Sequence, residues 1–499
     1  MNETHVGLLS LNNLAVQASS LVNAQDTEFA IAHENGEARL AILAPTGSPV
    51  LSKFDGITSE QGSQTLLLGP TNAHNMNMLR SIFDWLRPRT LGLATSAGFG
   101  DRLGLATPGH IRALRAVGGN IAPIFAQQSI REMTRTARSA QQVMDDATWG
   151  VFAEGWQTGF GGDADHLKAT ADIDACLAAG FTFYTIDPGE HVDNTAETAD
   201  PATLNDLYER LPWQRLEDSA KGLLGRYQGQ TIDVEGHQIA FDEHTLKKAA
   251  VKYGRAVAHV TTMYRHLVES AGSRDWELEV SVDETEQPTT HAEHLYIVNE
   301  LRRLGVKWVS LAPRYVGSFE KGIDYKGDLA VFEADIAVHA AISRQYGPYK
   351  LSLHSGSDKF SIYPAAVRQT GGMVHLKTAG TSWLEALRVV AALDPALFRD
   401  IYTLARDRYE TDRASYHVSG TLEDAPLPNA VPDSELPGLL EQLSVRQILH
   451  VTFGSVIKDE GLAARLMTLL KAHPEDYAAV VARHFERHLA PFAQAGQSQ

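Results

Sequence analysis

Short apolar runs alternate with amphipathic, helix-like stretches from about residue 90 onward. Several of these stretches end in glycine, which is a common stop signal for a helix. Strands that alternate with helices favour parallel βαβ units, and eight units in roughly 290 residues predict a (β/α)8 barrel. The predicted strands cover residues 90–95, 121–127, 149–155, 181–187, 277–284, 307–313, 349–356 and 373–380.

The alternation is interrupted once, between about residues 190 and 276, where the segment is too long for one crossover helix. We predict a mostly helical insertion there, after the fourth strand, with a small hairpin within residues 230–241. The barrel with its insertion is predicted to occupy residues 86–395. An N-terminal lead-in of mixed structure (1–85) precedes it, and a helical C-terminal extension (396–499) follows it.

Net charge, cysteine content and the lengths of the apolar runs limit the kinds of partner and compartment that are expected. The formal charge of −17 over 499 residues argues against a nucleic-acid partner, although a local basic pocket could still bind a small anion. The single cysteine, Cys176, permits no internal disulfide and fits a reducing compartment. No apolar run approaches the roughly 20 residues of a membrane span, and no signal-peptide pattern opens the chain. We therefore expect a cytoplasmic protein without a membrane partner.

Polar and titratable residues gather after the predicted strands, which is where active sites lie in this barrel class. Loops are polar in general, so solvation or helix capping is the alternative explanation for each acid. Asp163 or Asp165, for example, could cap the helix that follows them. Glu279 differs because it lies within an apolar strand, where a carboxylate is costly unless it is paired or binds a metal. His354 ends a strand, and both a structural and a functional role stay open for it.

Imidazole and carboxylate groups at several strand ends are the ingredients of a divalent-metal site, for Zn²⁺, Mn²⁺, Co²⁺ or Ni²⁺. The chain has no HExxH motif, Walker A motif or GxSxG elbow, and its glycine-rich segments lack the context of a dinucleotide fingerprint. Basic residues at the same strand ends suit an anionic substrate, or balance neighbouring acids. They are Arg102, Arg131, Arg314, Lys321, Lys359 and Lys377.

Several longer motifs together resemble the bacterial tagaturonate/fructuronate epimerase family. In chain order they are GFGDRLGLATPGHI, PIFAQQSIREMTRT, GWQTGFGGDADHLK, TIDPGEHV, LAPRYVGSFEKGIDYKGDL and LSLHSGSDKFSIYP. The resemblance extends from about residue 90 to about residue 480. It implies a metal-dependent (β/α)8 enzyme that interconverts two keto-hexuronates differing at one hydroxyl-bearing carbon.

The resemblance also implies roles for individual residues. Asp165 would be the proton acceptor and Glu279 the proton donor, while His166 and His354 would bind the metal. The third ligand is best assigned to Glu320, with Asp324 and Asp328 as alternatives. Residues expected to bind the substrate are Gln127, Arg314, Ser355, Asp358 and Lys377.

Two other functions stay open at the level of sequence. The first is a metal-dependent ketose isomerase or aldolase on the same barrel. The second is a non-catalytic sugar-acid-binding protein, although an intact set of acid, base and ligands argues against it. In either case the expected partner is a small anionic sugar, and a homo-oligomer is possible.

Overall fold

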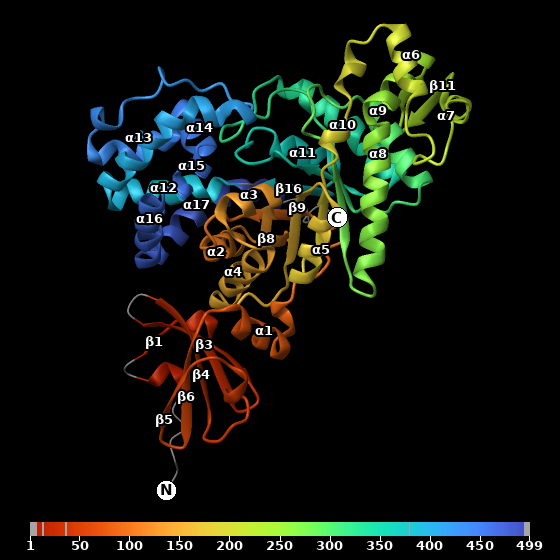
Figure 1. The fold of residues 1–499 in the computed structure, drawn as a ribbon. Helices are drawn as coiled ribbons and strands as arrows, with labels where there is room; N and C mark the ends of the chain where they lie inside the picture. Colours follow the sequence, from red (N-terminus) through yellow and green to blue (C-terminus); the bar gives the residue numbers. More distant parts are fainter. Residues whose placement is uncertain (1–6, 12–13, 35–36, 379, 494–499) are drawn as a thin grey trace.

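Eight parallel strands close into a barrel, which confirms the predicted (β/α)8 fold (Figure 1). The computed structural model describes residues 7–11, 14–34, 37–378 and 380–493. Around the barrel the strands follow the order β10-β13-β14-β15-β16-β7-β8-β9. Their bounds are β7 Ser96–Gly100, β8 Ala122–Ser129, β9 Gly161–Leu167, β10 Phe183–Ile186, β13 Glu277–Ser281, β14 Ser310–Ala312, β15 Lys350–Leu353 and β16 Val374–Thr378.

Two of the predicted strands, the third and the first, are wrong. Residues 149–155 were expected to form the third strand, but most of them belong to the helix α4 (Ala140–Ala153), which a capping box at Ser139 begins. A short apolar run does not distinguish a buried strand from a buried helix. The third strand is instead β9, whose sequence GGDADHL was expected to be a loop. Polar residues occupy it because they line the candidate site described below.

The first strand is also wrong, because β7 occupies Ser96–Gly100 and none of the predicted residues 90–95. Its sequence, SAGFG, is rich in small residues because neighbouring side chains approach it closely. A Cβ atom at Gly98 would lie only 1.7 Å from Oε1 of Gln127, on the adjacent strand β8. Bulk at this position would therefore displace Gln127, which is one of the predicted substrate-binding residues.

Helices that follow the strands form the outer layer of the barrel (Figure 1). Helix α9 shows why such segments begin where they do, because Thr290 and Glu293 form a reciprocal capping box at its start. The helices are α2 Thr107–Val117, α3 Ile130–Thr136, α4, α5 Thr170–Ala179, α8 Glu243–Ala271, α9 His291–Arg303, α10 Leu329–Tyr346, α11 Tyr363–Thr370 and α12 Thr381–Leu393. None of the described helices is long and apolar enough to cross a bilayer.

An antiparallel sheet precedes the barrel and lies below it in the view of Figure 1. Its strands follow the order β1-β3-β4-β6-β5, with β2 paired to β3, and helix α1 (Ala73–Ile82) leads into the barrel. Gln17 donates a hydrogen bond of 2.9 Å to the carbonyl of Ala153 and so attaches the sheet to α4. The strands are β1 Ala15–Val16, β2 Val22–Ala24, β3 Thr27–Glu34, β4 Glu37–Pro45, β5 Ile57–Gln61 and β6 Gln64–Pro70.

The insertion after β10 contains helices α6 (Pro201–Glu209) and α7 (Ala220–Tyr227) and the hairpin of β11 (Gln230–Val234) and β12 (His237–Phe241). The long helix α8 then returns the chain to the barrel (Figure 1).

The residues after α12 form helices, and α17 packs back against α2. This C-terminal part lies beside the barrel in Figure 1 and reaches over the loops at one end of it. The helices are α13 Pro395–Asp412, α14 Leu443–Val451, α15 Phe453–Lys458, α16 Glu460–Ala472 and α17 Pro474–Ala493.

Candidate functional site

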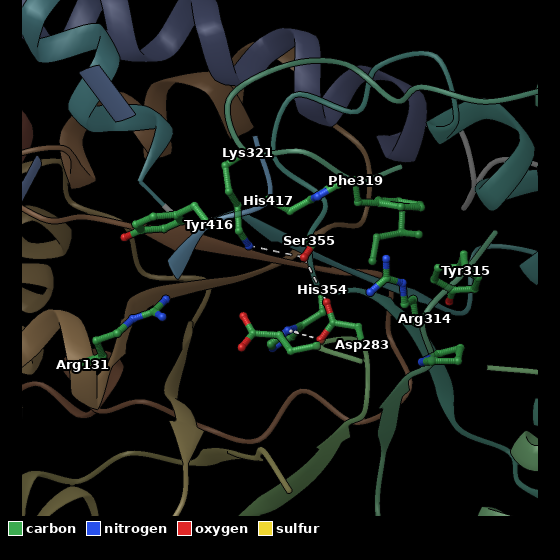
Figure 2. A pocket seen from close by; sticks show the side chains of 13 residues that line it. Arg131, Asp283, Arg314, Tyr315, Phe319, Lys321, His354, Ser355, Tyr416 and His417 are labelled. Carbon is green, nitrogen blue, oxygen red and sulfur yellow. Dashed lines mark hydrogen bonds and ion pairs between the residues drawn. The ribbon is translucent and has the colours of Figure 1, made fainter. Parts of the chain in front are cut away.

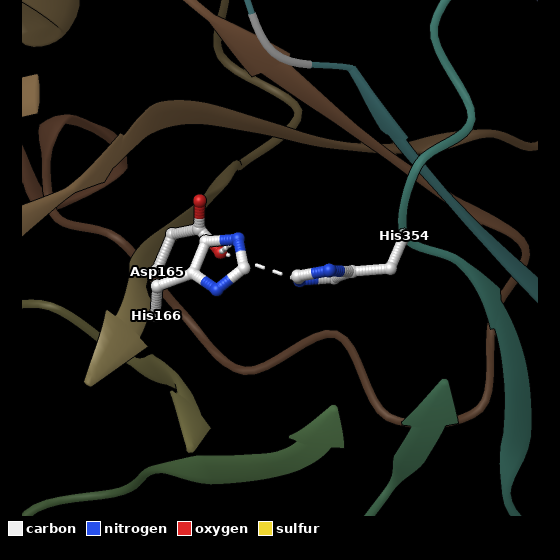
Figure 3. Close-up of side chains that lie close together, drawn as sticks. All are labelled: Asp165, His166 and His354. Carbon is white, nitrogen blue, oxygen red and sulfur yellow. Dashed lines mark ion pairs between the residues drawn. The ribbon is translucent and has the colours of Figure 1, made fainter. Parts of the chain in front are cut away.

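Two histidines and an aspartate meet at the carboxyl end of the barrel strands (Figure 3). Asp165 and His166 lie near the end of β9, and His354 directly follows β15. His354 Nε2 lies 3.3 Å from Asp165 Oδ1, and His166 Nε2 lies 3.9 Å from the same oxygen. Ligand-capable atoms of the three residues lie within 4.8 Å of one another. The structure thus brings together three of the residues that were predicted to form the site.

A β-bulge explains how two consecutive residues of β9 reach one site. Successive side chains of a regular strand point to opposite faces, so Asp165 and His166 would diverge. Here the pairing with β10 shifts register, and Tyr184 pairs with Ala164 whereas Ile186 pairs with Leu167. His166 adopts a φ of 53°, which is unusual for a residue other than glycine. Bulges re-aim side chains near active sites, and this one directs both residues into the cluster.

A carboxylate fixes the orientation of each imidazole. His166 Nδ1 lies 3.0 Å from Asp187 Oδ2, at the end of β10. His354 Nδ1 lies 3.1 Å from Asp283 Oδ1, which follows β13. Metal-binding histidines commonly donate the second ring N–H to a carboxylate in this way. In both residues the arrangement leaves Nε2 facing the centre of the cluster.

Two further buried carboxylates complete the acidic group. Glu279 is fully buried in β13; its Oε2 accepts a hydrogen bond from Ser310, while its Oε1 lies 3.6 Å from His354 Nε2. Burial and the nearby charges of Asp165 and Glu279 raise the pKa of Asp163 well above its ordinary value. Asp163 therefore tends to carry a proton. Its Oδ1 accepts a hydrogen bond of 2.9 Å from Thr185, so it does not cap the helix that follows.

Lys377 places a positive charge beside these acids. Its Nζ lies 2.7 Å from Asp165 Oδ2 and 3.3 Å from His354 Nε2. Burial raises the pKa of Asp165, but the charges of His166 and Lys377 outweigh burial and hold it well below its ordinary value. Burial opposes protonation of His354, yet Asp283 and Asp165 raise its pKa to about 10. Asp165 is accordingly ionised in this arrangement.

The donor set fits a divalent cation. Imidazole nitrogens together with carboxylate oxygens suit Zn²⁺, Mn²⁺, Co²⁺ or Ni²⁺. Asp165 Oδ1 and Glu279 Oε1 are buried without a hydrogen-bond partner in the described part of the chain. Asp165 is ionised, and a buried charged oxygen such as its Oδ1 is costly without a partner, so a bound cation would remove that cost. Glu284 offers another oxygen at the rim, 3.9 Å from His166 Nε2.

A pocket opens from this cluster toward the C-terminal helices (Figure 2). It encloses about 250 Å³ and meets a second hollow that also borders His354 and contains Asp165 and Lys377. The two hollows share a rim of Arg131, Glu284, Lys321, His354, Ser355 and Tyr416. A small polar molecule in the pocket would therefore contact the cluster directly.

Basic groups border the two hollows, but not all of the predicted ones are free for a ligand. Arg102 balances Glu132, and Lys359 donates to backbone carbonyls. Neither guanidinium of Arg131 and Arg314 forms an ion pair with any carboxylate of the described residues. Arg131 lies 5.8 Å from the ring centre of Tyr416, and Lys321 Nζ donates a hydrogen bond of 3.4 Å to Ser355. These cations are available to a negatively charged ligand.

The structure does not bring Glu320 into the cluster. Its carboxylate accepts hydrogen bonds from Lys326 (3.0 Å), Ser419 (2.7 Å) and Gln447 (2.9 Å). These contacts tie the loop after β14 to the C-terminal helices and occupy the oxygens that a metal would need. The two alternative ligands also have other partners. Asp324 accepts a hydrogen bond from the Ser361 hydroxyl, and Asp328 caps α10.

Two predicted substrate-binding residues lie in unexpected positions. Asp358 lines neither hollow, because it points toward the C-terminal helices and lies 3.3 Å from both Arg446 and His484. Its role there is to anchor the loop that follows His354. Gln127 borders the inner hollow, but its amide donates to the carbonyl of Thr378.

Sequence reasoning assigned no role to several residues that the structure places at the site. Asp187, Asp283 and Glu284 lie at the ends of the predicted strands 181–187 and 277–284, but only the fold shows which imidazole each one faces. Tyr416 and His417 come from the C-terminal extension and line the pocket. No local pattern could have found them, because they reach the site through tertiary packing alone.

We expect Asp187→Asn to weaken divalent-metal binding by roughly 10- to 100-fold, because the carboxylate that orients His166 is lost. Isothermal titration of chelator-treated protein measures this change. Glu190→Gln is the matched control, since Glu190 lies nearby but pairs with Lys168 at the surface (2.9 Å). Equal metal affinity in Asp187→Asn and the control would contradict the orienting role.

Together, the fold and the strand-end cluster define a (β/α)8-barrel enzyme with a carboxylate–imidazole site. Comparisons with known proteins identify the family. The sequence profile of tagaturonate epimerase matches residues 17–492. A tagaturonate/fructuronate epimerase of Thermotoga maritima is 48% identical over 418 residues, which cover 84% of this chain and 85% of that protein.

Comparison with solved structures supports the same family. The glycerol complex and the native form of the fructuronate-tagaturonate epimerase UxaE from Cohnella laeviribosi each superpose with a TM-score of 0.90 at 36% identity, over 97% of both chains. The chain belongs to the tagaturonate epimerase family, and it is therefore an epimerase, an enzyme of the isomerase class.

Proposed function

We propose that this enzyme interconverts D-tagaturonate and D-fructuronate, using a divalent metal ion and the carboxylates of Asp165 and Glu279. The names of its relatives support the substrate pair. The observation that carries the catalytic part is the cluster itself. Two imidazoles, each oriented by its own carboxylate, present Nε2 to a point flanked by Asp165 and Glu279.

The reaction poses a chemical problem that such a cluster can solve. The inverted carbon lies one bond beyond both acidic positions, those next to the ketone and next to the carboxylate. Removal of its hydrogen gives no enolate stabilisation, so simple proton abstraction is disfavoured. Cleavage of the bond between this carbon and the one next to the ketone avoids the problem. Re-forming that bond on the opposite face of the resulting aldehyde inverts the carbon.

The chain's own groups supply the proton transfers. In the cleavage direction Asp165, which is ionised, accepts the proton of the hydroxyl on the inverted carbon, and the bond breaks to give an aldehyde and an enediolate. When the bond re-forms, Glu279 in its protonated form is placed to give its proton to the new alkoxide, because its Oε1 faces the cluster without a hydrogen-bond partner. Asp165 then holds one proton and Glu279 has lost one, so the substrate's proton count is unchanged. The reverse reaction exchanges the two roles.

His166 and His354 would hold the metal ion. Glu284 replaces Glu320 as the proposed third ligand, because it borders His166 at the rim whereas the carboxylate of Glu320 is engaged elsewhere. When bound, the divalent ion supplies Lewis-acid polarisation of the substrate's carbonyl and hydroxyl oxygens. Zn²⁺, Mn²⁺, Co²⁺ and Ni²⁺ all accept this donor set.

The unpaired basic groups of the pocket suit the carboxylate of a hexuronate. We expect Arg314→Gln to reduce kcat/KM for tagaturonate by roughly 10- to 100-fold, mainly through KM, because one charge-assisted hydrogen bond is lost. Steady-state kinetics on tagaturonate and on the neutral ketose tagatose separate this effect from a general one.

Arg344→Gln is the control, because Arg344 pairs with Glu235 (2.7 Å) on the outer surface. If Arg314→Gln impaired the uronate and the neutral ketose equally, Arg314 would have no part in carboxylate recognition.

Product chromatography of the wild-type enzyme with tagaturonate tests the proposed reaction. Formation of fructuronate supports it. An aldose product, or release of three-carbon fragments as final products, would point instead to an isomerase or an aldolase. The cytoplasmic location and the oligomeric state stay predictions from the sequence.

A further inference from the structure

A second group of metal-binding side chains lies outside the barrel strands, between α9 and α10. His291 is the first residue of α9, whereas Asp335 and His339 lie one turn apart on α10. His291 Nε2 lies 3.1 Å from Asp335 Oδ1, and His339 Nε2 lies 3.7 Å from the same oxygen. Ligands around a tetrahedral zinc ion lie about 3.4 Å apart, given metal–ligand distances of about 2.1 Å. Both distances to Asp335 are therefore close to those around zinc, and ligand atoms of all three side chains lie within 4.8 Å of one another.

The buried imidazole of His339 provides an independent indication of a ligand. The residue is fully buried, and its Nε2 has no hydrogen-bond partner in the described structure. Its Nδ1 lies 2.8 Å from Nδ1 of His294, whose Nε2 lies 2.8 Å from the Tyr349 hydroxyl. Burial lowers the pKa of His339, and a hydrogen bond to the backbone of Thr289 opposes this shift. If Nδ1 of His339 donates to His294, its Nε2 presents a lone pair toward the Asp335 carboxylate, and two acceptors then face each other.

Two acceptors that face each other repel, and a cation bound between His339 Nε2 and the Asp335 carboxylate would remove this repulsion. Both α10 side chains are held in place by a second group, as metal-binding side chains commonly are. His294 orients His339, and the backbone N–H of Val316 donates to Asp335 Oδ2 at 3.3 Å. Solvent reaches the cluster from one side, since 34% of the His291 side chain is exposed. An ion therefore has a path of entry, and water can complete its coordination.

We propose that His291, Asp335 and His339 bind a structural Zn²⁺ ion, distinct from the metal at the strand ends. The ion joins the first turn of α9 to the middle of α10. Through Val316 it also steadies the loop after β14, which carries Arg314 into the pocket. Its role is to stabilise this side of the barrel and not to take part in the reaction.

Another buried group, formed by Asp358, His484 and His488, has similar composition but different chemistry. His488 Nε2 already accepts a hydrogen bond of 3.0 Å from the backbone N–H of Asp358. Arg446 lies 3.3 Å from the Asp358 carboxylate and supplies its positive charge. His484 Nε2 and both Asp358 oxygens also lack a hydrogen-bond partner among the described residues. The guanidinium of Arg446 already provides the counter-charge there, so this group is a salt-bridged anchor for the C-terminal helix α17.

Zinc stoichiometry in a background without the strand-end site tests the proposal. We expect the double variant His166→Ala/His354→Ala, stripped with a chelator, to bind one equivalent of Zn²⁺ and to gain thermal stability from it. Adding His291→Ala should remove both the zinc and the gain in Tm. Adding His266→Ala instead should change neither, because His266 belongs to a surface pair with Asp174 (2.8 Å).

Absence of zinc from the double variant, or one retained equivalent after His291→Ala, would overturn the proposal. Folding of each variant is checked first by its unfolding transition without metal. If the double variant does not fold, Co²⁺ titration of the wild type and of His291→Ala decides the question. The proposal requires one equivalent fewer in His291→Ala, and equal stoichiometry would refute it.

Discussion

We expect His354→Ala to lose both the strand-end metal and essentially all epimerase activity. The substitution removes one of two imidazoles that face the same point and leaves Asp283 without its buried partner. Lewis-acid polarisation contributes several kcal/mol to such reactions, so turnover should fall on the order of 10³-fold or more. Elemental analysis of the purified variant, together with product chromatography on tagaturonate, measures both effects.

His473→Ala is the control for this variant, since His473 is a surface residue paired with Asp476 at the start of α17 (3.3 Å). It should keep both metal and activity. Metal content at the wild-type level in His354→Ala would show that His354 does not bind the metal and has a structural role only.

A second large effect is expected for Glu279→Gln, which should retain its metal but lose turnover. The amide preserves the shape of the side chain but cannot exchange a proton at the cluster. A positioned acid or base contributes roughly 10²- to 10⁴-fold to the rate, and we expect a fall of that size in kcat with little change in metal affinity. Steady-state kinetics and metal titration separate the two quantities.

Glu277→Gln is the matched control, because it lies two residues earlier on the same strand. Its carboxylate accepts hydrogen bonds from the backbone N–H groups of Leu91 and Gly92, at the opposite end of β13. The control should lower stability by about 1–3 kcal/mol and leave kcat nearly unchanged. Comparable loss of kcat in both variants would show that Glu279 acts through the fold and not as an acid.

The barrel could be predicted from the sequence because alternating strands and helices leave a strong periodic signal. The third strand could not, because β9 carries Gly161, Gly162, Asp163 and Asp165, residues that usually indicate a loop. Its side chains serve the site, so their polarity concealed the strand. The apolar run before it belongs to a buried helix, and a short apolar run alone does not distinguish the two.

The site was predictable only in part. Asp165, His166, Glu279 and His354 meet as expected, because strand ends of a closed barrel converge. Glu320, which was predicted to be the third ligand, lies outside the cluster, since the loop after β14 offered three acids and only the folded chain shows their partners. The bulge at His166 is likewise a property of backbone pairing with β10 that sequence spacing does not reveal.

One measurement tests the central claim most directly. Wild-type enzyme is stripped with a chelator and incubated with tagaturonate, and fructuronate is then quantified before and after addition of a single divalent ion. We predict little product from the stripped enzyme and recovery of epimerisation when Zn²⁺, Mn²⁺, Co²⁺ or Ni²⁺ is restored. Full activity in enzyme shown to be free of metal, or no fructuronate with any of these ions, would contradict metal-dependent epimerisation at this site.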